Sequence, residues 1–339
     1  MEQQGWTPQP FVYAPPPTPQ QLERRWLRRK GNFAGALMLA NTAGLLLTFN
    51  ILAVILLLAG VLDRSQLTQP LLGMDKVSYL LVYAGVYSFA MLVPAALVAL
   101  CGKRRYFPLS PAHRVNGPDA FLAVVAGVGV CMLANIIGSY VTAFLEQFGA
   151  SAPETPDMLE PTPTGFAVYL IVFAVLPALL EEAVMRGYLL RELRPFGDGA
   201  AVFMSALFFG MMHGNIRQIP FAFVVGLVLG WLYVATDNIW LPVAVHFCNN
   251  GVSVLIEYLG DGMNESAFGV LNWIVIGALI LLGLMAVAIL LLRRSELLRL
   301  PAQPRSSLNA GQRWSALFTS PVLLLALGVL LVQAVLEAV

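Results

Sequence analysis

Nine stretches of mainly apolar residues run through the 339-residue chain and limit its fold more than any other feature. Only 12% of the residues are charged and the mean hydropathy is +0.75, whereas soluble domains carry about 25% charged residues. About 20 apolar residues cross the hydrocarbon core of a bilayer as a helix. The sequence therefore predicts an all-α, polytopic membrane helix bundle with about nine spans, at residues 33–62, 77–101, 119–145, 166–190, 199–213, 220–235, 239–258, 267–292 and 315–336.

The basic residues indicate which way this bundle is oriented. Nine crossings place nearly all of them on one side, and the other side carries only Arg64, Lys76 and Arg217. Loops rich in Lys and Arg lie in the cytosol, so we expect a cytosolic N-terminus and an external C-terminus. The residues on the predicted cytosolic side are Arg24, Arg25, Arg28, Arg29, Lys30, Lys103, Arg104, Arg105, Arg114, Arg191, Arg194, Arg293, Arg294, Arg299, Arg305 and Arg313.

Four regions follow from this pattern. Residues 1–32 are rich in Pro and Gln and then basic, which favours a disordered or extended cytosolic tail. Residues 33–164 hold the first three predicted spans, 165–258 a helical core with unusual polar residues, and 259–339 the C-terminal spans. The three cysteines have no paired spacing that suggests a disulfide framework or a CxxC metal site. We expect the lipid bilayer as a partner, and no nucleic acid.

Two adjacent acids, Glu181 and Glu182, lie in the middle of the fourth apolar stretch. The fifteen residues between Gly165 and Glu181 carry no charge, and a charge at the centre of a membrane helix costs at least about 2.5–3.5 kcal/mol. Glu182 and Arg186 are four residues apart and can pair on one helix face. Glu181 points about 100° away from Glu182, so the two acids are expected to have different roles.

Further polar residues occur at a similar depth in two other apolar stretches. Phe209 and His213 are four residues apart, as are His246 and Asn250, so each pair shares a helix face. The rise of ~1.5 Å per residue places Glu181 roughly 14 Å, His213 roughly 21 Å, His246 roughly 12 Å and Asn250 roughly 18 Å from the cytosolic edge. Three helices are thus predicted to bring polar groups together inside the membrane.

These groups suit amide hydrolysis, which needs a base, an acid and donors for the oxyanion. A desolvated Glu can act as the base, and a His can share the proton transfer. Each residue also has a structural alternative: Glu182 and Arg186 as an ion pair that fastens helices, and His213, His246 and Asn250 as hydrogen-bonded packing residues. Pro177, four residues before Glu181, is expected to kink the helix and loosen its backbone hydrogen bonds near the site.

The motifs Glu181-Glu182-xxx-Arg186, Phe209-xxx-His213 and His246-xxx-Asn250, in this order, resemble the CPBP family. That family, also called ABI, contains type II CAAX prenyl endopeptidases and bacteriocin-processing or bacteriocin-immunity proteins. The resemblance covers residues 165–258. It implies an all-helical intramembrane endopeptidase whose cavity opens towards the cytosol.

The resemblance also implies a role for each residue. Glu181 and His213 would activate water, His246 and Asn250 would hold the oxyanion, and Glu182 and Arg186 would support them. No cofactor is expected, although Glu181, His213 and His246 offer a possible zinc site. The implied substrate is a membrane-anchored or membrane-spanning peptide, such as a prenylated C-terminal tail or a bacteriocin leader. An ion-coupled membrane transporter and a non-catalytic, immunity-type binding protein are the alternatives.

Overall fold

The computed structural model describes residues 16–104, 108–110, 113–147, 157–294, 299–301 and 306–337. All regular secondary structure within these ranges is helical, which confirms the predicted all-α class. The longer α-helices are α1 (Pro19–Leu58), α2 (Lys76–Cys101), α3 (Gly117–Glu146), α7 (Asp198–Met211), α8 (Ile219–Thr236), α9 (Trp240–Gly260), α10 (Glu265–Arg293) and α12 (Pro321–Leu336). The shorter ones are α4 (Pro163–Leu170), α5 (Leu176–Glu182), α6 (Arg191–Leu193) and α11 (Ala310–Phe318).

The structure has fewer candidate membrane spans than the nine that the sequence predicts. Within the described ranges, six helices are long and apolar enough to cross a bilayer, or seven if α11 and α12, bent by 66°, form one span. The predicted span at 199–213 corresponds to α7, whose 14 residues reach only about 21 Å. The predicted span at 239–258 corresponds to α9, which carries a His and two Asn in its apolar sequence and is not among the six. The protein is nevertheless a multi-pass membrane protein, and the count of nine is not confirmed.

The first helix begins earlier than the sequence analysis expected. It starts at Pro19, so residues 19–32, which were predicted to be extended, are helical. Thr18 and Gln21 form a capping box: the Gln21 amide donates to the Thr18 hydroxyl at 3.3 Å, and the Thr18 amide donates to the Gln21 side chain at 2.9 Å. This cap, with proline in the first turn, starts the helix before the apolar stretch. Residues 1–15 of the predicted tail lie outside the described residues.

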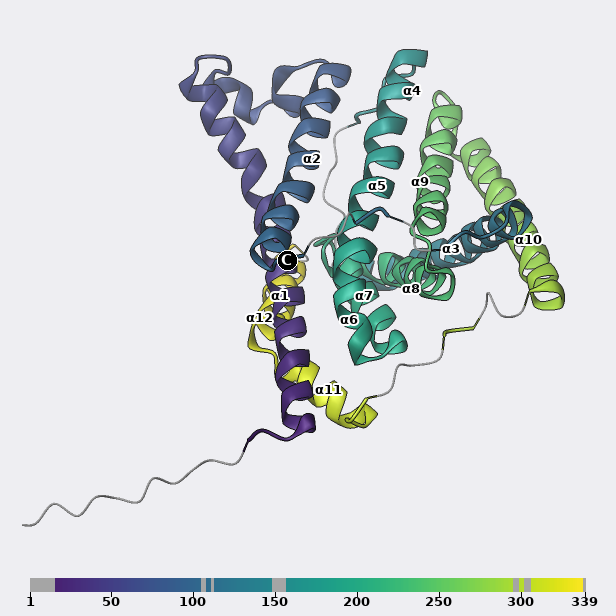
Figure 1. The fold of residues 1–339 in the computed structure, drawn as a ribbon. Coiled ribbons are helices and arrows are strands. Elements are labelled where there is room, and N and C mark those ends of the chain that lie inside the picture. Colours follow the sequence, from purple (N-terminus) through teal and green to yellow (C-terminus); the bar gives the residue numbers. More distant parts are fainter. Residues whose placement is uncertain are drawn as a thin grey trace, which may run out of the picture.

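Three upright elements frame the centre of the molecule. Figure 1 shows α2, α4 with α5, and α9 side by side, and α4 and α5 pack against both neighbours. The helix α1 packs on α2 and α12, α3 packs on α10 and α8, and α7 packs on α8. The largest cluster of buried apolar residues lies among these helices, so the segment that contains the two glutamates runs through the core.

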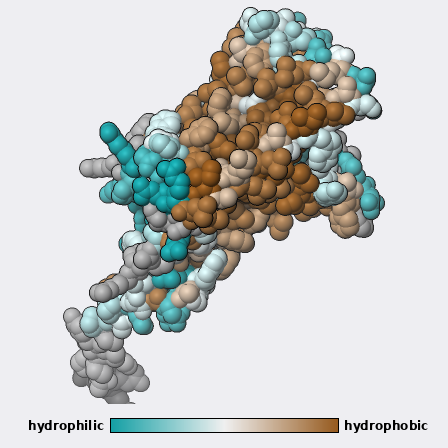
Figure 2. All heavy atoms as spheres, turned by 90° about the vertical axis from the view of Figure 1, so that its right-hand side faces the viewer, coloured by the Kyte–Doolittle hydropathy of each residue, from teal (hydrophilic) through white to brown (hydrophobic). Residues whose placement is uncertain are grey.

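The outer surface suits a lipid environment. Figure 2 shows a broad band of hydrophobic atoms on the side of the molecule where α10 lies, with hydrophilic residues gathered at its margins. The large apolar side chains of α10 that contribute to the exposed surface include Trp273, Ile274, Leu281, Leu282 and Met285. In water such a surface would be unfavourable, whereas in a bilayer it contacts lipid tails.

Close packing of α3 on α10 depends on glycine, and this generates a stability prediction. A Cβ added at Gly283 would lie 2.6 Å from the Cα of Gly129, whereas one added at Gly277, on the same helix, meets nothing within 4 Å. We expect Gly283→Ala to destabilise the folded protein by about 1–3 kcal/mol through overpacking. Gly277→Ala is the matched control. Thermal unfolding in detergent should show a lower midpoint for Gly283→Ala only, and equal midpoints would contradict the packing described.

Candidate active site

The two glutamates lie between two wide helical turns. Glu181 and Glu182 end α5, which is preceded by the π-helix η3 (Ile171–Val175) and followed by the π-helix η4 (Ala183–Leu190). Pro177 has no N–H for the carbonyl of Phe173 one turn earlier. The predicted loosening of backbone hydrogen bonds near Pro177 thus takes the form of a π-helical turn, a feature that is frequent at functional sites.

Asn250 on α9 satisfies the carbonyl that proline leaves without a partner. Its Nδ2 donates to the Phe173 oxygen at 3.0 Å, and its Oδ1 accepts from Asn249 Nδ2 at 3.1 Å. An amide nitrogen carries two hydrogens, so one remains for another acceptor. Asn250 therefore has a packing role between α9 and the fourth span, and it also lines the cavity described below.

Glu182 forms the predicted ion pair and a second, unpredicted contact. Its Oε1 accepts from Arg186 Nη1 at 2.9 Å and from His246 Nδ1 at 2.9 Å. Arg186 Nη2 also donates to the backbone oxygen of Gly226 at 3.1 Å, and its guanidinium carbon lies 4.7 Å from the centre of the Phe209 ring. Glu182 and Arg186 are both fully buried. Their opposite charges offset each other in a region without water.

Glu181 has different surroundings, as the helix geometry predicted. Its Oε1 accepts a 2.5 Å hydrogen bond from the hydroxyl of Tyr87 on α2. Its Oε2 is buried and has no hydrogen-bond partner among the described residues. The Nε2 atom of His246 lies 3.9 Å from this oxygen. One oxygen of Glu181 is thus held in place and the other is left for a ligand.

Both histidines present Nε2 rather than Nδ1 to the site. A carboxylate only accepts hydrogen bonds, so the contact with Glu182 assigns a hydrogen to Nδ1 of His246. Nδ1 of His213 lies 2.8 Å from the carbonyl oxygen of Phe209, which likewise assigns it a hydrogen. Phe209 fixes both rings, with ring centres 5.2 Å from His213 and 5.7 Å from His246 in edge-to-face geometry. His213 can therefore cap the end of α7 through Nδ1 and still present Nε2 to the cavity.

A cavity of about 500 Å³ brings the predicted residues together. Glu181, His213, His246 and Asn250 all line it, although they come from the fourth span, the segment after α7, and α9. Glu182 and Arg186 lie behind this lining and do not reach the cavity. Glu181, His213, His246 and Asn250 can therefore contact a ligand in the cavity. Glu182 and Arg186 instead support this lining from behind. An opening towards the cytosol is not shown.

Residues 163–252, which form these elements, match a family described as type II CAAX prenyl endopeptidase Rce1-like. This match is consistent with the resemblance of residues 165–258 to the CPBP family. It is 22% identical over 192 residues to the membrane-embedded CAAX protease MroQ of Staphylococcus aureus (strain USA300), covering 54% of this chain and 77% of that protein. It is 21% identical over 141 residues to YdiL of Bacillus subtilis (strain 168), described as a membrane peptidase, covering 41% of this chain and 57% of that protein.

No solved structure matches the chain. The family and the two relatives support a membrane protease with several spans. Both relatives are similar to this chain at low identity, so what each of them cleaves is known of that relative and not of this chain.

The possible zinc site can be compared with the geometry of its three residues. Within the described ranges, no group of three His, Cys, Asp or Glu side chains is arranged to hold an ion. Glu181, His213 and His246 share one cavity, and the contacts of Nδ1 and of Glu181 Oε1 leave Nε2 of each histidine and Oε2 of Glu181 as the atoms that could bind an ion. The zinc site suggested by the sequence therefore stays a prediction.

One contributor to the site was not predicted. Tyr87 donates to Glu181 from a helix 94 positions earlier in the sequence. It ends a stack of tyrosines on α2, with ring centres of Tyr79 and Tyr83 6.5 Å apart and those of Tyr83 and Tyr87 6.0 Å apart. A tyrosine at every fourth position of an apolar helix was the available signal, because that spacing places all three on one face.

The buried ion pair leads to a prediction about stability. Arg186→Met leaves the Glu182 carboxylate buried with only His246 as partner, which should destabilise the protein by about 3–5 kcal/mol. Thermal unfolding in detergent measures this change. The matched control is Arg217→Met, which breaks the ion pair between Arg217 and the half-exposed Glu146 and should cost about 1 kcal/mol or less. Equal losses in the two variants would contradict the central place of the Glu182 contact.

Proposed function

We propose that the protein is an intramembrane endopeptidase that hydrolyses a peptide bond in a membrane-associated protein or peptide. The observation that carries this proposal is the environment of Glu181: one carboxylate oxygen is fixed by Tyr87, and the other is buried beside a cavity and has no hydrogen-bond partner among the described residues. The opposite charges of Glu182 and Arg186 balance each other. Glu181 is therefore the carboxylate that remains available to take a proton.

The proposed reaction uses water as the nucleophile. Glu181 Oε2 accepts a proton from water, and His213 Nε2 helps to activate the same water molecule. The water oxygen then adds to the carbonyl carbon of the peptide. The negative charge that forms on the carbonyl oxygen is stabilised by the second hydrogen of Asn250 Nδ2 and by His246. With Nδ1–H donated to Glu182, His246 offers Nε2–H when it carries both protons. The tetrahedral species then breaks its C–N bond, and the proton held by Glu181 passes to the leaving amine.

The supporting residues set the geometry of this reaction. Glu182 orients the His246 ring through Nδ1, and Arg186 neutralises Glu182. Phe209 contacts both histidine rings and the guanidinium group. A water-poor site of this kind strengthens each electrostatic interaction. The proposed mechanism needs no metal, and the proposed partner is a membrane-anchored or membrane-spanning peptide, as the names of the relatives suggest.

The central test is the loss of the base. Glu181→Gln keeps the shape of the side chain but removes its proton affinity, and His213→Ala removes the second participant. Each should lower the cleavage rate by about 100-fold or more. The measurement is the cleavage of fluorescence-quenched peptides by the purified protein in lipid nanodiscs, one peptide with an apolar span and one with a prenylated C-terminal cysteine.

Matched controls exist for both substitutions. Glu257 is an exposed carboxylate on α9 that accepts from Tyr169, so Glu257→Gln should leave the rate unchanged. His113 is exposed and contacts Asp237 away from the cavity, so His113→Ala should do the same. Full cleavage by both Glu181→Gln and His213→Ala would contradict an endopeptidase built on this site. Ion flux across liposomes that depends on Glu181, without any cleavage product, would favour a transporter.

A second prediction concerns metals. Prolonged treatment with 1,10-phenanthroline, followed by removal of the chelator, should leave the cleavage rate unchanged, because the proposed mechanism activates water with Glu181 and His213 and uses no metal. The isomer 1,7-phenanthroline, whose nitrogens cannot chelate one ion, serves as the control. Loss of activity that added Zn²⁺ restores would overturn the metal-free mechanism, while the endopeptidase assignment would stand.

A further inference from the structure

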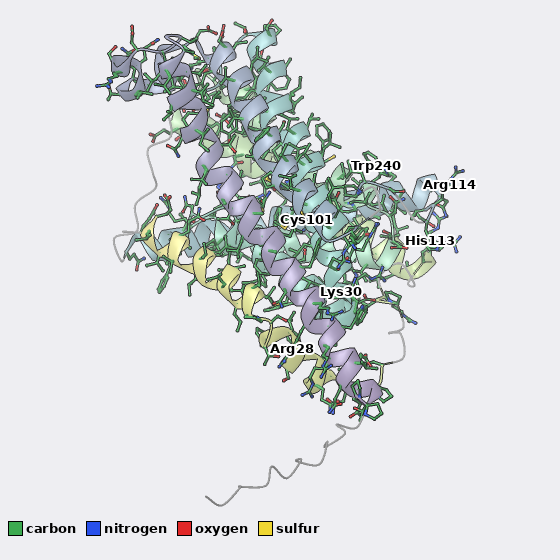
Figure 3. All side chains as sticks on the ribbon, turned by 60° about the vertical axis from the view of Figure 1, so that its left-hand side comes forward. Arg28, Lys30, Cys101, His113, Arg114 and Trp240 are labelled. Carbon is green, nitrogen blue, oxygen red and sulfur yellow. The ribbon has the colours of Figure 1, made fainter. Side chains whose placement is uncertain are left out.

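The two ends of the helix bundle differ in charge. Figure 3 shows Arg28 and Lys30 near the start of α1, and His113 and Arg114 at the side of the bundle, higher in the view. Ion pairs join the elements around Lys30: Glu192 Oε2 lies 2.9 Å from Lys30 Nζ and 2.5 Å from Arg104 Nη2. Since basic residues accumulate in the cytosol, the end of the bundle where α1 begins, here called the basic end, faces the cytosol.

The opposite end is poor in cations. In the part of the chain that the structure describes, its basic residues are Arg64, Lys76 and Arg217. Lys76 pairs with Asp157 at 2.7 Å, and Arg217 pairs with Glu146. These contacts fix the segment that follows Asp157 and the segment between α7 and α8 at the extracytoplasmic end of the bundle.

The cavity extends from Glu181 towards this extracytoplasmic end. Its lining includes Met158, next to Asp157, and Gln218, next to Arg217. Gln218 is exposed and Met158 is half-buried, whereas Glu181 and His246 are buried at the inner wall. The lining thus becomes more exposed towards the end that is poor in cations.

Towards the basic end the cavity is closed. Glu182 and Arg186 lie behind Glu181 and are fully buried. Leu189 and Leu190, one turn further on, are also fully buried in the main core. A peptide that came from the cytosol along the fourth span would have to displace this packed layer.

We propose that the cavity receives its peptide from the extracytoplasmic side of the membrane. This inference rests on the proposed function for its substrate class, which is an apolar, membrane-inserted peptide whose scissile bond lies outside the cytosolic leaflet. The wall of the cavity suits such a segment, because Leu45, Tyr83 and Phe221 line it and offer apolar and aromatic surface. The cytosolic opening is implied only by the family resemblance. The extracytoplasmic opening proposed here rests on the residues that line the cavity and on the distribution of charged residues at the two ends of the bundle.

Thiol labelling tests the proposal without requiring catalysis. Gln218→Cys places a thiol at the proposed mouth, and Met158→Cys is a second variant in case the first does not fold. The natural Cys101, exposed at the basic end of α2, is an internal control for the opposite side. Spheroplasts that produce the full chain are treated with a membrane-impermeant maleimide, and each cysteine is quantified by peptide mass mapping.

The expected result is modification of the introduced thiol in intact spheroplasts at a level at least ten times that of Cys101. After permeabilisation both thiols should react. Reaction of Cys101 alone in intact spheroplasts would overturn the proposal in favour of a cytosolic opening. No reaction of the introduced thiol in either variant, even after permeabilisation, would show that no mouth exists there and would also overturn it.

The outcome is separate from that of the proposed function. If Glu181→Gln retains full activity while the labelling pattern is as expected, the endopeptidase mechanism fails and the direction of access stands. If cleavage depends on Glu181 but only Cys101 is labelled in intact spheroplasts, the mechanism stands and the direction of access fails.

Discussion

A single buried oxygen, Oε1 of Glu182, connects most of the site. It accepts from Arg186 on its own helix and from His246 on α9. Arg186 in turn reaches the backbone of α8 at Gly226 and the ring of Phe209 on α7. A carboxylate this deep in a membrane protein is tolerated only when it is paired, so four helical elements must be in place before the charge is compensated. The stability of the core and the orientation of His246 therefore have the same origin.

This arrangement also explains how structural and functional readings of the residues coexist. Glu182 and Arg186 form the helix-fastening ion pair that the sequence allowed as an alternative, and through it they orient a histidine that reaches the cavity. Asn250 closes a gap in the backbone hydrogen bonding left by Pro177 and keeps one amide hydrogen for another partner. His213 caps a carbonyl through Nδ1 and leaves Nε2 unengaged. Asn250 and His213 are thus each held by contacts to the backbone and each keep an atom that can meet a ligand in the cavity.

Local sequence patterns predicted much of this, and long-range contacts account for most of what they missed. The spacing of Glu182 and Arg186, and the separate environment of Glu181, follow from helix geometry. The convergence of His213, His246 and Asn250 was indicated by depth alone. Tyr87 could not be assigned, because its contact with Glu181 depends on how α2 packs on α5. The spacing of Thr18 and Gln21 is typical of a capping box and indicates the start of α1. The apolar stretch begins only at residue 33, so hydropathy alone placed the start of the first span too late.

The count of nine spans is not confirmed, because hydropathy reports the composition of a segment and not whether the segment crosses the bilayer. The 14 residues of α7 are apolar enough to resemble a membrane helix, yet they end inside the bundle, where the following residues place His213 beside the cavity. The bend of 66° between α11 and α12 likewise divides one apolar stretch into two directions. Backbone that leaves the helical path at membrane depth is tolerated where protein rather than lipid surrounds it.

The paired π-helices on either side of α5 have a consequence for how this span meets its neighbours. A π turn accommodates an extra residue compared with an α turn, and one residue corresponds to about 100° of rotation around the axis. A helical wheel drawn through the whole span with one constant period therefore loses phase twice. The π turn of η3 thus rotates the side chains of α4 relative to those of α5, which carries Glu181 and Glu182. The π turns of η4 rotate the side chains of α6 relative to those of α5 in the same way. Insertion or deletion of one residue within η3 or η4 would change this phase without altering any residue of the three motifs.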